Sequence, residues 1–261
     1  MKKLSLLLAL IMVFGCVFTG FVACDKDDDG DKSGDQSGGD KTSTEKPYMV
    51  CLGDSITYGQ DGDPSVDAGT RMKTPYPTII KNQLRYDVEN LAVPGATVST
   101  AIKRPDDSIR PSIFEQLDLI EGTPDIISIM GGVNDSGSVV IGENSAANRD
   151  TKNFYGAMRS LISELKVNYP DAFIFFITPL RTESHQDPTN ENDKLTQVAT
   201  AIKTICAEFE IPVYDAYTEI EIDFTDPDTS SDGVHIASKV IKNAVAPKII
   251  QFIKDNYKVA E

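Results

Sequence analysis

The sequence predicts an α/β protein with a parallel five-stranded sheet and helices on both faces. Short apolar runs of strand length alternate with longer amphipathic stretches along most of the 261 residues. An apolar fraction of 40% is enough to build a core. We find no internal repeat and no second linker in residues 47–261, so we expect one domain there.

The N-terminal residues 1–23 are typical of a secretory signal peptide. Two lysines precede the apolar run 4–22, and a small residue precedes Cys24. The tripeptide Val22-Ala23-Cys24 resembles a bacterial lipoprotein signal, in which the cysteine is lipidated and becomes the new N-terminus. We therefore expect Cys24 to carry a lipid anchor that tethers the fold outside the cytoplasm. The alternatives are lipidation at Cys16, and an uncleaved anchor helix formed by the apolar run.

Residues 24–46 form the next segment, and we expect a flexible acidic linker. Its Asp, Gly, Ser and Lys composition cannot bury a core. Asp25, Asp27 and Asp29 match the start of a calcium loop, but Gln36 replaces the bidentate Glu, so we predict no metal site. The whole chain has a net charge of −15. Such an acidic surface argues against binding to nucleic acid, and leaves the lipid anchor as the predicted membrane contact.

The remaining segments supply the sheet and its helices. Strands are predicted at residues 48–52, 87–91, 125–130, 173–178 and 212–214. Helices are predicted at residues 75–85, 109–121, 153–169, 190–208 and 236–257, the last kinked at Pro247. Cys51 and Cys206 fall inside these elements, and we expect two buried free thiols. The sequence holds no Cys/His cluster of the kind that binds metal.

In an open parallel sheet, ligands bind beyond the carboxyl ends of the strands. This rule selects the loops 53–74, 92–100 and 131–142, together with the segment before His235. The loop 179–189 is a fifth possible wall. We expect the candidate functional residues to meet at this edge of the sheet.

Ser55 follows the first strand in Gly53-Asp54-Ser55, which places a hydroxyl at the mouth of the sheet. It is our candidate nucleophile. His235 and Asp232, three residues apart in Asp232-Gly233-Val234-His235, offer a base and a carboxylate that orients it. An ordinary Asp-Gly turn before a helix also fits that segment. The other histidine, His185, lies in a polar loop, and we expect it to be solvated.

Two further loops offer hydrogen-bond donors. Gly95 lies in a turn after the second strand, where its backbone N–H can approach a substrate closely. Asn134 follows two glycines after the third strand and could donate its amide to a developing oxyanion. Both also fit plain turns. We interpret Asp54 and Asp135 as structural residues that fix their turns, and the polar stretch 60–74, with Arg71 and Lys73, as a cleft wall or a surface excursion.

Taken in order, Gly53-Asp54-Ser55, Gly95, Gly132-Val133-Asn134-Asp135 and Asp232 with His235 resemble the SGNH/GDSL hydrolase family. The resemblance spans nearly the whole domain at residues 47–261. It implies a flavodoxin-like three-layer α/β/α fold, with Ser55 as nucleophile, His235 as base and Asp232 as its orienting acid. It also implies an oxyanion hole formed by the N–H groups of Ser55 and Gly95 and the side chain of Asn134. A Gly-x-Ser-x-Gly elbow is absent, since Thr57 stands at the second glycine.

These observations predict an extracytoplasmic serine esterase that works through an acyl-enzyme without metal or organic cofactor. The membrane tether favours a small-molecule or glycan ester met at the cell surface, so our first choice is a carbohydrate O-acetylesterase. The alternatives are a lysophospholipase or other lipase-type esterase, which would need a large apolar groove, and a glycan-binding lipoprotein without activity. The presence of Ser55, Asp232 and His235 together argues against the binding protein.

Overall fold

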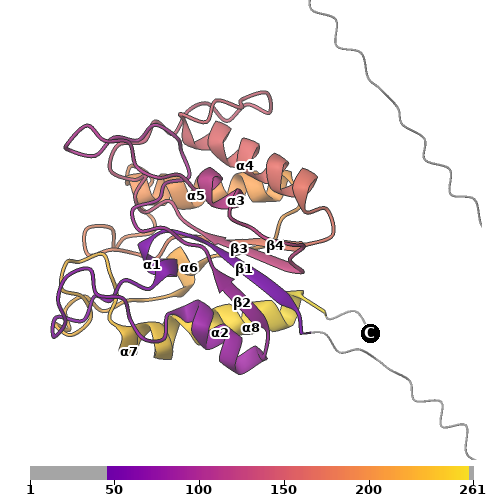
Figure 1. Cartoon of the computed structure of the whole chain (residues 1–261). Coiled ribbons are helices and arrows are strands. Elements are labelled where there is room, and N and C mark those ends of the chain that lie inside the picture. The colour runs from indigo at the N-terminus through magenta and orange to yellow at the C-terminus, as the bar shows by residue number, and fades with distance from the viewer. Residues whose placement is uncertain (1–45, 259–261) are drawn as a thin grey trace, which may run out of the picture. The chain divides into compact units, whose positions relative to one another are not determined.

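The computed structural model describes residues 46–258 (Figure 1). The predicted signal at 1–23, the lipidation site Cys24, its alternative Cys16 and the linker 24–46 lie outside the described residues, apart from Lys46. They remain predictions. Among residues 46–258, no helix combines the length and the apolar character needed to cross a bilayer.

Five parallel strands form one sheet, which confirms the predicted fold class. Their order is β2-β1-β3-β4-β5, the flavodoxin-like arrangement. The strands are β1 (Tyr48–Gly53), β2 (Asp87–Asn90), β3 (Ile126–Met130), β4 (Phe173–Ile177) and β5 (Val213–Tyr214). β1 pairs with β2, where Tyr48 lies opposite Asp87, and with β3, where Gly53 lies opposite Met130. The strand that precedes Ser55 is therefore an interior strand, at the point where the strand order reverses.

Helices cover both faces of this sheet, as Figure 1 shows. One side carries α2 (Tyr76–Leu84) and the C-terminal helices, and the other carries α3 (Ile113–Leu117), α4 (Phe154–Asn168) and α5 (Lys194–Glu208). Alternate residues of β1 point to opposite faces of the sheet. Met49 and Cys51 pack against α2 and the C-terminal helices, and Val50 and Leu52 pack against α3, α4 and α5. A strand with both faces buried must be apolar throughout, which is why the run 48–52 predicted it so well.

Two helical predictions need correction. Residues 109–121 were expected to be helical, but α3 covers only Ile113–Leu117. Arg110 pairs with Ile102 in a hairpin, Pro111 lacks the N–H that a helix interior needs, and Ser112 begins α3 with a capping box to Glu115.

The final helix is interrupted as expected, although not by a simple proline kink. The π-helix η1 (Ile241–Val245) lies between α7 (Ser238–Val240) and α8 (Ala246–Asn256). Pro247 stands in the first turn of α8, where its missing N–H costs least. Two short helices, α1 (Ser55–Tyr58) and α6 (Ala216–Glu219), were not predicted.

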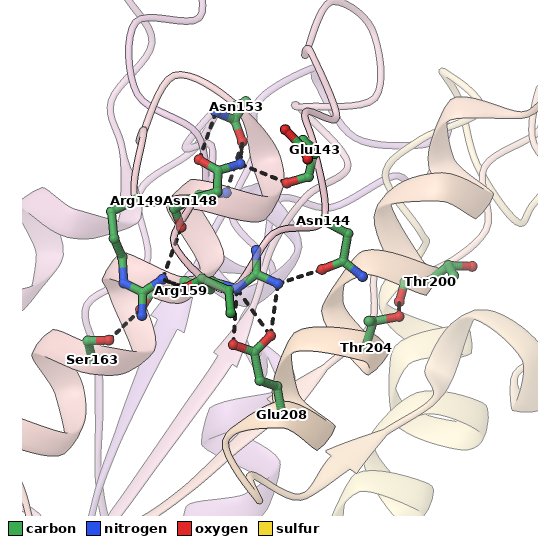
Figure 2. Close-up of polar contacts among 12 residues, drawn as sticks. Glu143, Asn144, Asn148, Arg149, Asn153, Arg159, Ser163, Thr200, Thr204 and Glu208 are labelled. Atoms are coloured by element: carbon green, nitrogen blue, oxygen red, sulfur yellow. Dashed lines mark hydrogen bonds and ion pairs between the residues drawn. The ribbon is translucent and has the colours of Figure 1, made fainter.

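A partly buried ion pair joins the two longest helices (Figure 2). Arg159 on α4 is 1% exposed, and its Nε and Nη2 donate to the carboxylate of Glu208, at the end of α5, over distances of 2.8 to 3.1 Å. Nη2 also donates to Asn144 in the loop before α4. These bonds hold the pKa of Glu208 below its ordinary value. The pair therefore fixes α4, α5 and that loop as one layer.

Cys51 and Cys206 are buried and form no disulfide, as predicted. Burial raises the pKa of both thiols. Neither is a candidate reactive thiol, because the thiolate is the reactive form.

Candidate active site

Ser55 lies where β1 turns into α1. Asp54 caps α1, because its side chain accepts a 2.9 Å hydrogen bond from the N–H of Ile56. Gly53 lies against β3 so closely that a Cβ atom there would be 2.3 Å from the carbonyl oxygen of Met130. The serine is 5% exposed. The strand end, the cap and this close approach together fix the serine in a sharp strand-to-helix turn.

His235 reaches Ser55 from the far end of the chain. Its Nε2 lies 2.8 Å from Ser55 Oγ, and its Nδ1 lies 2.6 Å from Asp232 Oδ2. The other carboxylate oxygen of Asp232 accepts bonds from the N–H groups of Val234 and His235, at 3.0 and 2.8 Å. Partial burial of Asp232 acts to raise its pKa, but these hydrogen bonds outweigh burial and lower it. The structure thus brings the three predicted residues together in the order serine, imidazole, carboxylate.

The predicted oxyanion donors lie on the neighbouring loops. Gly95 has φ +80°, a conformation that favours glycine. Within the described part of the chain, the N–H groups of Ser55 and Gly95 donate no hydrogen bond to another residue. Asn134 donates one Nδ2 bond of 3.0 Å to the carbonyl of Ala96, which ties its loop to that of Gly95. One amide hydrogen of Asn134 is left for another acceptor.

The two buried aspartates hold turns in place. Asp135 is fully buried and accepts from the N–H groups of Val98 and Ser99 at 2.9 and 2.8 Å, so it joins the loop after β3 to the loop after β2. Burial raises the pKa of Asp135 to about 6 and that of Asp54 to about 7. Within the described residues, neither aspartate forms a hydrogen bond with a histidine.

Gln116 was missed by the sequence analysis. Its side-chain amide accepts from Gly53 N–H at 2.8 Å and donates to Gly53 C=O at 2.7 Å, so it serves as a substitute strand partner at the end of β1. It is 1% exposed on α3. A polar residue between Ile113 and Leu117 on the apolar side of a predicted helix is the signal that could have found it.

Within the stretch 60–74, residues 60–62 pack on the site, whereas residues 64–71 are exposed. A Cβ atom on Gly62 would lie 1.8 Å from the carbonyl oxygen of His235, and Gly62 C=O accepts a 2.7 Å bond from Ser231 N–H. Gln60 Nε2 lies 3.3 Å from His235 Nδ1. Arg71 stacks on the ring of Tyr58, 4.3 Å from its centroid. This stretch therefore braces the histidine segment.

His185 differs from its prediction. It is partly buried, and its Nδ1 lies 2.5 Å from Asp193, the residue that caps α5. Within residues 46–258, no group of three His, Cys, Asp or Glu side chains is placed to hold a metal ion.

Two hollows bear on substrate size. A small recess of about 10 Å³ borders Asp54 and Ile56, beside the serine, and Val234, beside the histidine. A hollow of about 260 Å³ lies at α4 and α5, where Tyr155, Thr196 and Thr200 line it, and none of its lining residues is a predicted site residue. Neither Ser55 nor His235 lines the smaller recess, which has room for about one water molecule.

Comparison with known proteins gives a consistent result. Residues 51–239 match the GDSL-like lipase/acylhydrolase family. A search of curated proteins found no significant match.

Several solved structures share the fold. A lipase/acylhydrolase from Enterococcus faecalis is 20% identical with a TM-score of 0.56, over 82% of this chain and 99% of that one. An aryl esterase from M. smegmatis is 16% identical with a TM-score of 0.60, over 81% and 100%. An active-site mutant of a family two carbohydrate esterase from Clostridium thermocellum is 18% identical with a TM-score of 0.57, over 80% and 64%.

Proposed function

The chain belongs to the GDSL-like lipase/acylhydrolase family, and from this premise we propose that it is an extracytoplasmic serine esterase. The observation that carries the proposal is the continuous contact from Ser55 Oγ through His235 to Asp232, at 2.8 and 2.6 Å. A serine hydroxyl is a weak nucleophile unless a base removes its proton, and this contact provides the base.

In the proposed reaction, Ser55 Oγ attacks the ester carbonyl while His235 Nε2 takes the hydroxyl proton. Asp232 holds the ring through Nδ1 and stabilises the imidazolium that forms. The N–H groups of Ser55 and Gly95 and the amide of Asn134 stabilise the oxyanion. The imidazolium returns its proton to the leaving alcohol, and a water molecule activated by His235 then hydrolyses the acyl-enzyme.

For the substrate we propose a carbohydrate O-acetyl ester. The small recess of about 10 Å³ next to the proposed catalytic residues is lined by Asp54, Ile56 and Val234 but by neither Ser55 nor His235, and it offers no room for a long acyl chain. The fold is also that of a family two carbohydrate esterase. A lipase-type reaction would require a larger apolar groove at this place.

The decisive variant is Ser55→Ala in the full chain. We expect hydrolysis of p-nitrophenyl acetate to fall by on the order of 10⁴-fold or more, because the nucleophile is lost. Ser65→Ala, at an exposed serine that bonds only to Asp63, is the matched control and should keep full activity. An equally active Ser55→Ala enzyme would show that another group attacks. A wild-type enzyme without turnover that also resists a serine-directed phosphonate would support a binding protein instead.

The acyl preference is tested with acetylated oligosaccharides beside esters of increasing chain length. We expect kcat/KM to be highest for acetate and to fall as the chain grows. A preference for long chains would favour the lipase-type alternative.

A further inference from the structure

We propose that Arg104 and Arg110 form an anion-binding subsite beside the scissile ester, so that preferred substrates carry a carboxylate near that bond. This proposal rests on the proposed function, because it places the reacting carbonyl at Gly95 and Asn134. The sequence analysis did not single out either arginine.

Both arginines belong to a short hairpin that follows the loop of Gly95. Lys103 pairs with Ile109, Arg104 N–H donates to Ser108 C=O, and Arg110 N–H donates to Ile102 C=O. Side chains alternate between the two faces of such a hairpin, so Ile102, Arg104 and Arg110 share one face. Ile102 is buried and both arginines are partly buried, whereas Ile109 on the opposite face is 61% exposed. The hairpin thus turns its two guanidinium groups toward the protein.

The guanidinium groups lie next to Gly95. A Cβ atom on Gly95 would be 3.4 Å from Arg110 Nη1 and 3.6 Å from Arg104 Nη2. Arg110 Nη1 also lies 3.4 Å from Asn134 Oδ1 and 3.5 Å from the carbonyl oxygen of Gly95. Two positive charges therefore stand beside two of the three proposed oxyanion donors. A substituent a few atoms from the ester carbonyl would reach them.

Neither arginine forms an ion pair with a carboxylate in residues 46–258. Arg104 Nη1 contacts Ser108 Oγ at 3.3 Å and the carbonyl oxygen of Ile109 at 3.1 Å. The neighbouring carboxylates already accept other hydrogen bonds. Asp135 accepts from two backbone N–H groups, and Asp106 accepts from Ser108. Each guanidinium therefore keeps donors for a ligand. Its planar fork matches a carboxylate, and partial burial strengthens the pairing.

The test uses matched pairs of esters in which the anion is the variable. 3-Acetoxybenzoate and its methyl ester place the carboxylate on the alcohol side. Phenyl hydrogen succinate and phenyl methyl succinate place it on the acyl side. The quantity measured is the ratio of kcat/KM for the charged ester to that for its neutral partner. We expect a wild-type ratio above one for one pair, which also locates the subsite.

We expect Arg104→Gln and Arg110→Gln each to lower that ratio about tenfold, the typical effect of losing one hydrogen bond to a charged group. Lysine variants should keep part of the ratio, because the charge remains but the fork is lost. Arg149→Gln, at an exposed arginine that donates only to backbone carbonyls, is the control and should keep the wild-type ratio. If both glutamine variants keep that ratio, or lower both rates equally as a purely structural role predicts, the subsite does not exist.

A binding measurement distinguishes a failure of the subsite proposal from a failure of the proposed function. In Ser55→Ala, calorimetric titration should show tighter binding of the charged ester than of its neutral partner, and added Arg104→Gln should remove the difference. Arg-dependent binding without turnover in the wild type would refute the esterase proposal but support the subsite. Turnover with no charge preference in rate or in binding would support the esterase proposal and refute the subsite.

Discussion

His235 is held from several directions, although it lies in a segment without regular structure. Asp232 is 47% exposed, yet four bonds fix it: one to the imidazole, one from the hydroxyl of Ser230 and two from backbone N–H groups. Gln60 Nε2 lies 3.3 Å from the same ring nitrogen, but that nitrogen already donates its proton to Asp232 and cannot accept from an amide N–H. The orientation of the base therefore depends mainly on Asp232.

Asp232→Asn tests this at constant side-chain size. An amide cannot stabilise the imidazolium, and it can bind the wrong ring tautomer, so we expect kcat/KM to fall on the order of 10⁴-fold. Steady-state hydrolysis of p-nitrophenyl acetate measures the loss. Gln60→Ala is the comparison, and we expect it to lose less than tenfold. If the two losses are reversed in size, Gln60 orients the ring and Asp232 does not.

Asp54 makes stability depend on pH. Burial, together with the smaller effect of the neighbouring Asp135, raises its pKa from 3.8 to about 7, so the folded state binds more protons than the unfolded state between these values. Stability due to Asp54 therefore falls as the pH rises from about 4 to about 7.

Asp54→Asn removes this dependence but keeps an oxygen that can cap α1. Relative to wild type, we expect the variant to gain on the order of 1–3 kcal/mol of unfolding free energy between pH 5 and pH 8. Denaturant unfolding at both pH values measures the gain. Asp67→Asn, at an exposed carboxyl, serves as control. An equal difference from wild type at both pH values would contradict the assignment.

At the scale of elements, the buried strands were the easiest to predict, because apolar runs such as 48–52 leave few alternatives. The hairpin of residues 102–110 was not predictable in the same way. Its two short arms contain Lys103, Arg104 and Ile109 without a clear alternation, and Ile109 with Ile113 imitates helical spacing. Pairing between its arms outweighed that pattern. For this reason the sequence analysis missed Arg104 and Arg110.

Gly62→Ala tests the brace formed by residues 60–74. Because an added Cβ would lie 1.8 Å from the carbonyl oxygen of His235, one of the two segments must move. We expect a loss of about 2 kcal/mol in stability from overpacking and at least a tenfold loss in kcat/KM from displacement of the base. Gly137→Ala is the control, since nothing lies within 4 Å of its Cβ position. Full activity in Gly62→Ala would show that the two segments move without disturbing His235.

Across the whole molecule, the site is assembled from loops that are far apart in sequence. Ser55 and His235 are 180 residues apart and meet because strand β1 and the segment before α7 end at the same edge of the sheet. The residue types were predictable from the sequence, and the flavodoxin-like sheet was implied by the family resemblance. The distances between the site residues were not predictable, because they depend on contacts such as Gln116 with Gly53 and Gly62 with His235, which leave no periodic signal in the sequence.

We propose that a lipid on Cys24 anchors the whole protein to the membrane. In a bacterial host, the wild-type protein should sediment with membranes and incorporate labelled palmitate. Cys24→Ser should lose the label, because the thiol is the acceptor, whereas Cys16→Ser should keep it. Label lost only in Cys16→Ser would assign the anchor to the earlier cysteine. Membrane binding without label in all three proteins would instead indicate an uncleaved helix over residues 4–22, since an apolar run of that length can span a bilayer without any lipid.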